Sequence, residues 1–365
     1  MNQMFSNIFN WVNHRLPIVN TFERHLSKHP VPKKVNFWYL FGALASVVLI
    51  IQIVSGIWLI MPYENTEEGA FASVEYIMRD VDYGWVIRYM HTTGASLFFA
   101  VVYLHMFRGL LYGSYQKPRE LVWIFGCTIY LAMMAEGFLG YVLPYGQMSY
   151  WGAQVIISLF GAIPYVGESL ELWVRGDYYI SGITVSRFFA LHVVALPLVL
   201  IALVFLHLVA LHEVGAGNPE GVDIEAHLDD DGIPLDSVPF FPYKVLNALV
   251  GIGVFMTVFA IIMFFFPEGG GYFIEMANFE EANPLVTPEH IAPVWYYAPY
   301  YTMLRAIPDP LGGLIVMGSA VAIFFVVPWL DRSNVASIRY KGIYSKIALA
   351  LFALSFITLG YLGTV

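Results

Sequence analysis

Seven long stretches of mostly apolar residues constrain the fold of this chain more than any other feature. They cover residues 38–61, 85–111, 121–142, 184–211, 244–266, 311–330 and 346–363. A helix needs about 20 apolar residues to cross the hydrocarbon core of a bilayer, and each stretch is close to that length. In agreement, 58% of the chain is hydrophobic and only 12% is charged. The sequence therefore predicts an all-α polytopic membrane protein.

Lysine and arginine outside these spans are concentrated in alternate loops. Ten lie before the first span or after the second and sixth: Arg15, Arg24, Lys28, Lys33, Lys34, Lys117, Arg119, Arg332, Arg339 and Lys341. The opposite loops carry only Arg79, Arg175 and Arg305. Positive loops stay on the cytoplasmic side, so we expect a cytoplasmic N-terminus. The acidic loop 212–243 also falls inside, but acidic residues weigh little in this rule.

The segments between the spans suggest further elements. In residues 5–27, apolar residues recur at helical spacing, which favours an amphipathic helix on the membrane surface over a frayed terminus. We assign residues 1–37 to an inner-surface segment that contains this helix. We expect no cleavable signal peptide. In the outer loop 143–183, residues 151–159 and 166–174 are typical of short surface helices. The outer loop 267–310 is rich in proline and aromatic residues. It can cap an apolar ligand pocket or form an aromatic belt at the interface.

Two spans each carry a pair of histidines. His91 and His105 are fourteen residues apart, and His192 and His207 are fifteen apart. Fourteen residues make four turns less about 40°, so the first pair lies on one helix face, about 21 Å apart along the axis. Polar groups inside a bilayer are costly and usually functional. Two matched pairs therefore favour a functional site over local hydrogen bonding.

The two spans run in the same direction, because one span separates them. His91 and His192 therefore lie at a similar outer depth, and His105 and His207 at a similar inner depth. The only cysteine, Cys127, excludes an internal disulfide and a cysteine-held metal cluster. Two axial imidazoles leave no open position on a haem iron, which suits electron transfer. The sequence predicts two haems stacked through the membrane.

Glycines at the same interval support this interpretation. Gly42 and Gly56 in the first span, and Gly126 and Gly140 in the third, are each fourteen residues apart. Glycine permits close backbone approach, so the intervals favour a four-helix bundle wrapped around two haems. Three arginines near the ends of the histidine pairs are candidates for the haem propionates, with snorkelling to the interface as the alternative: Arg88, Arg108 and Arg187.

The fifteen-residue interval does not fit an ideal helix. It makes four turns plus about 60°, which is one residue too many relative to the other pair. Pro197 lies between His192 and His207. Proline removes a backbone donor, so we predict that a widened, π-type turn near Pro197 absorbs the extra residue.

Several stretches resemble cytochrome b of the cytochrome bc1 complex, the quinol–cytochrome c oxidoreductase, in its bacterial form. The resemblance runs from about residue 35 to residue 363. It rests on residues 79–85 (RDVDYGW), 88–91 (RYMH), 140–149 (GYVLPYGQMS), 187–192 (RFFALH), 282–285 (ANPL) and 293–296 (PVWY).

The resemblance implies a Q cycle that drives respiratory electron transport and proton translocation. Quinol, expected to be ubiquinol, is oxidised at an outer site, and one electron goes to a Rieske iron–sulfur protein. The other passes through the low-potential haem (His91, His192) to the high-potential haem (His105, His207), which reduces quinone at an inner site. Both haems would be b-type and non-covalent. Cytochrome c1 is a further implied partner, in a homodimeric complex of the bacterial inner membrane; no nucleic acid is expected.

The resemblance also implies residues of the two quinone sites. The outer quinol site would involve Tyr141, Gly146, Met148, Pro293, Trp295 and Tyr296, and the inner site His212. The chain departs from the family at both. The outer motif usually reads Pro-Glu-Trp-Tyr, with a glutamate that takes a quinol proton, but Val294 cannot titrate. We hypothesise that Glu136, in the third span, replaces it; a purely structural glutamate is the alternative.

Further departures concern the inner site and the number of spans. The family usually has Lys-Asp near the start of the fifth span, where this chain has Asn247 and Ala248. The acidic partner of His212 is therefore missing, which puts the inner proton route in doubt. The family also has eight spans, whereas seven occur in this sequence.

The sequence thus predicts four parts. They are an inner-surface segment (1–37), a dihaem four-helix bundle (38–218), an acidic linker (219–243) and a C-terminal three-helix part (244–365) that includes the quinol-site loop 267–310. The chain continues through 212–243, which favours the bc1 type over the b6f type, in which the two halves are separate chains. The fifteen-residue interval between His192 and His207 is shared with the b6 type and favours the opposite assignment. Two other interpretations stay open: a dihaem anchor subunit of a dehydrogenase, and a haem-free transporter that relays protons through buried histidine and glutamate.

Overall fold

The computed structural model describes residues 3–17, 19, 23 and 27–364. Within those residues, seven helical segments are long and apolar enough to cross a membrane. They are formed by α3 (Leu40–Ile60), α5 (Gly84–Tyr112), α6 (Glu120–Val142), α9 with α10 (Gly182–Ala190 and Leu196–Val214), α11 (Val245–Phe265), α13 (Pro310–Leu330) and α14 (Ile343–Leu362). The predicted all-α fold and its seven spans are confirmed, with ends within four residues of those expected.

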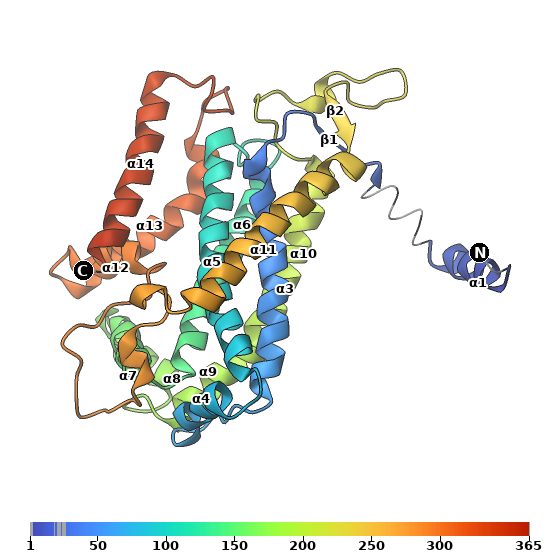
Figure 1. Ribbon diagram of the computed structural model, residues 1–365. Helices are drawn as coiled ribbons and strands as arrows, with labels where there is room; N and C mark the ends of the chain where they lie inside the picture. The colour runs from blue at the N-terminus through green and yellow to red at the C-terminus, as the bar shows by residue number, and fades with distance from the viewer. Residues whose placement is uncertain (1–2, 18, 20–22, 24–26, 365) are drawn as a thin grey trace.

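The N-terminal spans form a bundle of two tightly packed helix pairs. Helix α3 packs along α5, and α6 packs along α10. A 3-10 turn, η2 (Phe37–Tyr39), leads into α3, and Asn36 caps it through its side chain. Helix α11 crosses this bundle obliquely and contacts both α5 and α3 (Figure 1). Each pair thus joins a helix that carries two of the glycines, α3 or α6, to a span that carries two of the histidines.

Short helices gather at one end of the bundle, the lower end in Figure 1. They are α4 (Gly69–Arg79), α7 (Gln147–Ser158), the 3-10 turn η3 (Leu159–Ala162) and α8 (Gly167–Arg175). Helices α7 and α8 confirm the two surface helices predicted in loop 143–183. Helix α4 was not predicted. Its apolar residues Ala70 and Ile77 are buried, which explains its stability at the surface.

Loop 267–310 is a folded part of the molecule. It contains two 3-10 turns, η7 (Gly269–Gly271) and η8 (Met276–Phe279), and helix α12 (Ala298–Arg305), which packs on α13 and α14. The Tyr296 ring stacks on Phe99 of α5, with ring centres 3.9 Å apart. Val294, Tyr296 and Tyr300 are buried. The loop therefore packs into the core between the two halves, and these residues do not form an aromatic belt at the interface.

A small antiparallel sheet joins the N-terminal segment to the linker before α11. Strand β1 (Pro30–Pro32) pairs with β2 (Ser237–Pro239), with Val31 opposite Val238. A 3-10 turn, η5 (Ile224–Ala226), precedes it, and a turn with π-type bonding, η6 (Phe240–Lys244), leads into α11. Periodicity did not predict this sheet, because three-residue strands carry too little pattern.

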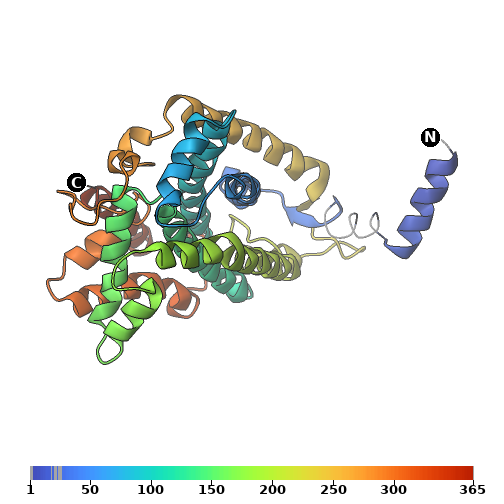
Figure 2. The ribbon, with the colours of Figure 1, turned by 90° about the horizontal axis from the view of Figure 1, so that it is seen from below.

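The first helix, α1 (Gln3–Arg15), lies apart from the bundle in Figure 2. Its apolar residues Phe5, Ile8 and Phe9 are exposed. The helix itself agrees with the expected amphipathic segment, and its location on the membrane surface stays a prediction. The rest of that segment falls partly on residues 18, 20–22 and 24–26, which lie outside the described residues.

A polar cluster at the opposite end of the bundle ties the loop after α13 to the N-terminal half. The Asp331 carboxylate accepts hydrogen bonds from the Lys341 ammonium at 2.5 Å and the Tyr115 hydroxyl at 2.6 Å. Both Asp331 and Lys341 are largely buried. Burial alone would raise the pKa of Asp331, but these two donors together lower it below its ordinary value.

We predict that Asp331→Asn destabilises the protein. It leaves the Lys341 ammonium buried without its carboxylate, at a cost of about 3 kcal/mol. The midpoint of thermal unfolding in detergent should fall by several degrees, whereas Arg332→Gln, at an exposed neighbour, should not change it. Because the folded pKa of Asp331 is depressed, its contribution is present above its unfolded pKa and is lost as pH falls through the folded value. An unchanged midpoint in Asp331→Asn would contradict this role.

Candidate functional site

The structure brings the four core histidines together in two pairs. The rings of His91 and His192 have centres 6.2 Å apart, and so do the rings of His105 and His207. Two imidazoles that bind one metal ion from opposite sides, each through a nitrogen about 2 Å from the metal, have ring centres about 6 Å apart. Both pairs therefore have the spacing of axial ligands to a single iron.

A π-helical turn sets the position of His192. It spans Leu191–Ala195, and the Leu196 N–H bonds to the Leu191 carbonyl. Pro197 follows at once, and its ring would collide with the carbonyl four residues before it in a regular helix. The widened turn takes up the additional residue between His192 and His207. This confirms the turn that the fifteen-residue interval predicts.

In three of the four histidines, Nδ1 is engaged by a neighbouring helix. Nδ1 of His91 lies 2.9 Å from the Ser55 hydroxyl oxygen. Nδ1 of His192 lies 3.0 Å from the Glu136 carbonyl, and Nδ1 of His207 lies 2.9 Å from the Val122 carbonyl. Such bonds fix the ring and leave Nε2 as the metal-binding nitrogen. Nδ1 of His105 is the exception, being buried without a partner.

Each of the four glycines faces one histidine ring. A Cβ atom added at Gly140 would lie 2.3 Å from Cε1 of His192, and one at Gly42 would lie 3.0 Å from Cε1 of His105. The corresponding distances are 3.4 Å from Gly56 to His91 and 3.5 Å from Gly126 to His207. The matching intervals therefore reflect direct contact, in which glycine makes room for an imidazole on the facing helix.

The three arginines differ in what they can bind. No hydrogen bond or ion pair to Arg88 occurs in the described part of the chain, although Arg88 lies in the electrostatic environment of His91 and Tyr63. Arg108 donates to Ser114, stacks on Tyr39 and has a buried Nε without a partner. The guanidinium groups of Arg88 and Arg108 can therefore each bind an anionic haem propionate.

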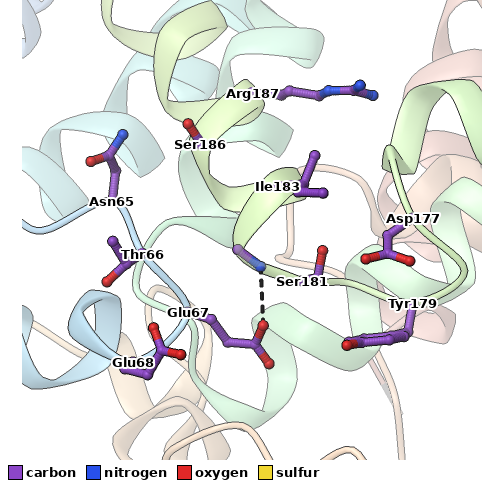
Figure 3. Close-up of a pocket in the computed structure, with 11 residues that line it drawn as sticks. Asn65, Thr66, Glu67, Glu68, Asp177, Tyr179, Ser181, Ile183, Ser186 and Arg187 are labelled. Carbon is purple, nitrogen blue, oxygen red and sulfur yellow. Dashed lines mark hydrogen bonds between the residues drawn. The ribbon is translucent and has the colours of Figure 1, made fainter.

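The side chain of Arg187 makes different contacts from those of Arg88 and Arg108. It donates to the Trp173 carbonyl at 2.9 Å. It also lines a surface pocket of about 650 Å³ together with Glu67, Asp177 and Tyr179 (Figure 3). There the Glu67 carboxylate accepts a hydrogen bond from the Gly182 N–H at the start of α9. A role of Arg187 toward a propionate stays a prediction.

The residues expected at the outer site gather around the end of α6. The Tyr141 hydroxyl donates to Glu275 at 2.6 Å, and the Asn278 amide donates to the Tyr141 oxygen at 2.8 Å. Gly146 pairs with residue 281 through the backbone, and Met148 is buried in α7. The site thus joins α6 and the start of α7 to loop 267–310.

The PVWY stretch lies beside this cluster. The Trp295 indole donates to the Ser96 hydroxyl at 3.3 Å. Pro293 is partly buried, next to Val294 in the core. The pKa of Tyr296 is raised by burial and, to a smaller degree, by the charge of Glu275. The sequence reasoning missed Glu275 and Asn278, because a loop carries no periodic signal.

Glu136 lies behind a histidine of the outer pair. Its carboxylate Oε1 is 3.1 Å from Nδ1 of His192, and its Oε2 is buried without a partner. Its backbone carbonyl also contacts the same nitrogen. The carboxylate can therefore influence the ring of His192 directly. Its predicted role as acceptor of a quinol proton is not decided by this contact.

At the inner end, His212 lies near the end of α10. Its ring centre is 4.4 Å from that of His29, which comes from the segment before β1. Lys33 and Lys244 lie in the same region, where Lys244 donates to the Lys33 carbonyl. The segment before β1 thus adds an aromatic neighbour to the expected inner site. This contact was not predicted, since it joins residues far apart in the chain.

Comparisons with known proteins agree on one family. Residues 26–215 match the family described as cytochrome b/b6/petB, and residues 281–365 match cytochrome b(C-terminal)/b6/petD. The chain is 56% identical over 361 residues to cytochrome b of Allochromatium vinosum, covering 97% of this chain and 87% of that protein.

Two further relatives extend this result. The chain is 46% identical over 353 residues to cytochrome b/c1 of Bradyrhizobium diazoefficiens, covering 97% of this chain and 50% of that protein. A solved chain of a hyperthermophilic respiratory Complex III superposes with a TM-score of 0.91 at 36% identity, covering 98% of this chain and 91% of that chain. These matches argue against the dehydrogenase-anchor and transporter interpretations.

The glycine contacts give a prediction with a matched control. Gly140→Ala forces the His192 ring out of position, whereas Gly126→Ala places its methyl group at ordinary contact distance from His207. We expect Gly140→Ala to lose one of two haems per chain, measured by a pyridine haemochrome assay, and Gly126→Ala to keep both. Alanine favours a helix over glycine, so helix disruption does not account for the loss. Full haem content in Gly140→Ala would show that the ring does not need this space.

Proposed function

Since the chain belongs to the cytochrome b family, we propose that its four core histidines hold two non-covalent b haems, one nearer each membrane surface. The chain is the cytochrome b of a respiratory complex III, a quinol–cytochrome c oxidoreductase that works by a Q cycle. The observation that carries the proposal is the 6.2 Å spacing of both histidine pairs. A bound b haem supplies a carrier for one electron at a time.

The residues of this chain fit that cofactor. His91 with His192 would hold the low-potential haem, and His105 with His207 the high-potential haem. Gly56, Gly140, Gly42 and Gly126 make room for these rings. The buried, unpartnered Nε of Arg108 supports a propionate at the inner haem. The guanidinium of Arg88, which has no hydrogen bond or ion pair to the described residues, supports one at the outer haem.

The outer quinol site is proposed at the junction of α6, α7 and loop 267–310. Tyr141, Gly146 and Met148 line it from one side, and Pro293, Trp295 and Tyr296 from the other. The polar groups of Tyr141 and its partners orient the quinol hydroxyl, and the apolar surroundings exclude water. The substrate is proposed to be ubiquinol, and the inner site to reduce ubiquinone beside His212.

We also propose partner subunits, a membrane location and a division into segments for this chain. The matches to complex III support a Rieske iron–sulfur protein and cytochrome c1 as partners, in a homodimer. The lysine and arginine distribution supports a cytoplasmic N-terminus in the bacterial inner membrane. The division into segments 1–37, 38–218, 219–243 and 244–365 is likewise proposed.

Histidine variants test the ligand assignment in the purified complex. We expect His192→Leu and His207→Leu each to contain one haem per chain and to lose most quinol–cytochrome c reductase activity. His227→Leu, at an exposed histidine of the acidic linker, should keep both haems and full activity. Two haems per chain in either of the first two variants would refute the assignment of that histidine.

Glu136 stays one candidate for the acceptor of a quinol proton, as its place in the third span suggests. We predict that Glu136→Gln slows quinol oxidation and also shifts the absorption band of the outer haem, because the carboxylate contacts Nδ1 of His192. Stopped-flow spectroscopy of haem reduction by quinol measures both effects. An unchanged rate and an unchanged pH profile would remove Glu136 from the reaction.

A further inference from the structure

A second carboxylate lies at the proposed outer site, on a part of the loop that no motif marks. Glu275 immediately precedes the turn η8 and accepts a hydrogen bond from Tyr141 at 2.6 Å. The Asn278 amide donates to Tyr141 at 2.8 Å and reaches the same Glu275 oxygen, Oε2, at 3.4 Å. Both side-chain donors act on Oε2, so Oε1 has no side-chain donor.

The Glu275 carboxylate is not neutralised by a cation. No lysine, arginine or histidine pairs with it in the described ranges 3–17, 19, 23 and 27–364. Burial raises the pKa of Glu275 above its ordinary value, although the hydrogen bond from Tyr141 opposes this rise. A partly buried carboxylate held only by neutral donors can bind a proton readily.

The neighbours of Glu275 come from three segments. Tyr141 belongs to α6, Asn278 to η8, and Tyr296 to the PVWY stretch. Tyr141 and Asn278 hydrogen-bond to the carboxylate, and Tyr141 and Tyr296 are proposed quinol-site residues. Val294 itself is buried in the core and carries no acid. Among the residues that the structure describes, Glu275 supplies the carboxylate that hydrogen-bonds to Tyr141 and Asn278.

We propose that Glu275 accepts a proton from quinol at the outer site, which rests on the proposed function of this chain. As quinol is oxidised, one of its O–H bonds breaks, and the proton forms a new O–H bond with the Glu275 carboxylate. The electron released with that proton would be taken up by the haem that His91 and His192 would hold. The second proton and the second electron go to the iron–sulfur partner. Tyr141 positions the carboxylate and keeps its own proton.

A small cavity adjoins Asn278, the hydrogen-bond partner of Tyr141 and Glu275. It has room for about one water molecule (20 Å³) and is lined by Asn278, Pro144, Arg88, Tyr89 and Glu75, among others. Glu75 pairs with the exposed Arg79 at 2.5 Å, so the cavity ends near the surface. Asn278 thus borders both the acceptor and the cavity.

The test is Glu275→Gln in the assembled complex, with Glu280→Gln as control. Glutamine still accepts the hydrogen bond from Tyr141 but cannot take a proton at this pH. We expect quinol–cytochrome c reductase activity to fall roughly tenfold or more, as general-base catalysis predicts, with both haems and their spectra unchanged. Glu280 is an exposed acid of the same loop, and its variant should keep full activity.

The pH profile separates a proton acceptor from a structural group. The acceptor works deprotonated, so the rate with Glu275 should fall as pH decreases through its pKa, and this decline should disappear in Glu275→Gln. Glu275→Asp keeps a titratable carboxylate and should retain the decline. Full activity with an unchanged profile in Glu275→Gln would overturn the proposal.

The outcome also distinguishes this inference from the proposed function. If the unsubstituted complex lacks haem or does not oxidise quinol, the proposed function fails. If the unsubstituted complex is active and Glu275→Gln matches it, only the role of Glu275 fails. Glu136→Gln gives the remaining comparison, since that variant should shift a haem band and Glu275→Gln should not.

Discussion

The packing of the membrane helices depends on one constraint, which is that a histidine ring inside a bilayer needs partners for its nitrogens. No water is present there to satisfy its two nitrogens, so each needs a partner in the protein or a metal. Nδ1 of His91, His192 and His207 finds one on the neighbouring helix. Glycine on that helix lets the ring approach. The two rings of each pair have centres 6.2 Å apart, and this arrangement determines which helices must pack together.

Much of this arrangement was predictable from the sequence, because it is periodic. The spans, the pairing of His91 with His192 and the fourteen-residue glycine interval all follow from helix geometry. Even the π-turn at Leu191–Ala195 follows from one additional residue and a proline. What the glycines contact was harder to anticipate. We expected space for a flat macrocycle, whereas each glycine faces a histidine ring.

The parts that sequence reasoning missed lie in segments without periodicity. Glu275, Asn278 and His29 reach their sites through contacts between residues more than a hundred positions apart. The place of Arg187 near a histidine pair suggested a propionate, which stays a prediction, and the contacts that the structure adds are the Trp173 carbonyl and a surface pocket. The outer site therefore combines a predictable framework with loop residues that only the fold identifies. Its acid–base chemistry falls in the second group.

The most direct test of the central claim is a reduced-minus-oxidised optical spectrum of the purified complex, with haem counted per cytochrome b chain. The claim is that two histidine pairs, each with ring centres 6.2 Å apart, hold two haems. The account predicts two low-spin b haems per chain, which titrate at separate potentials because their surroundings differ. One haem or none in a folded, fully assembled complex would contradict it.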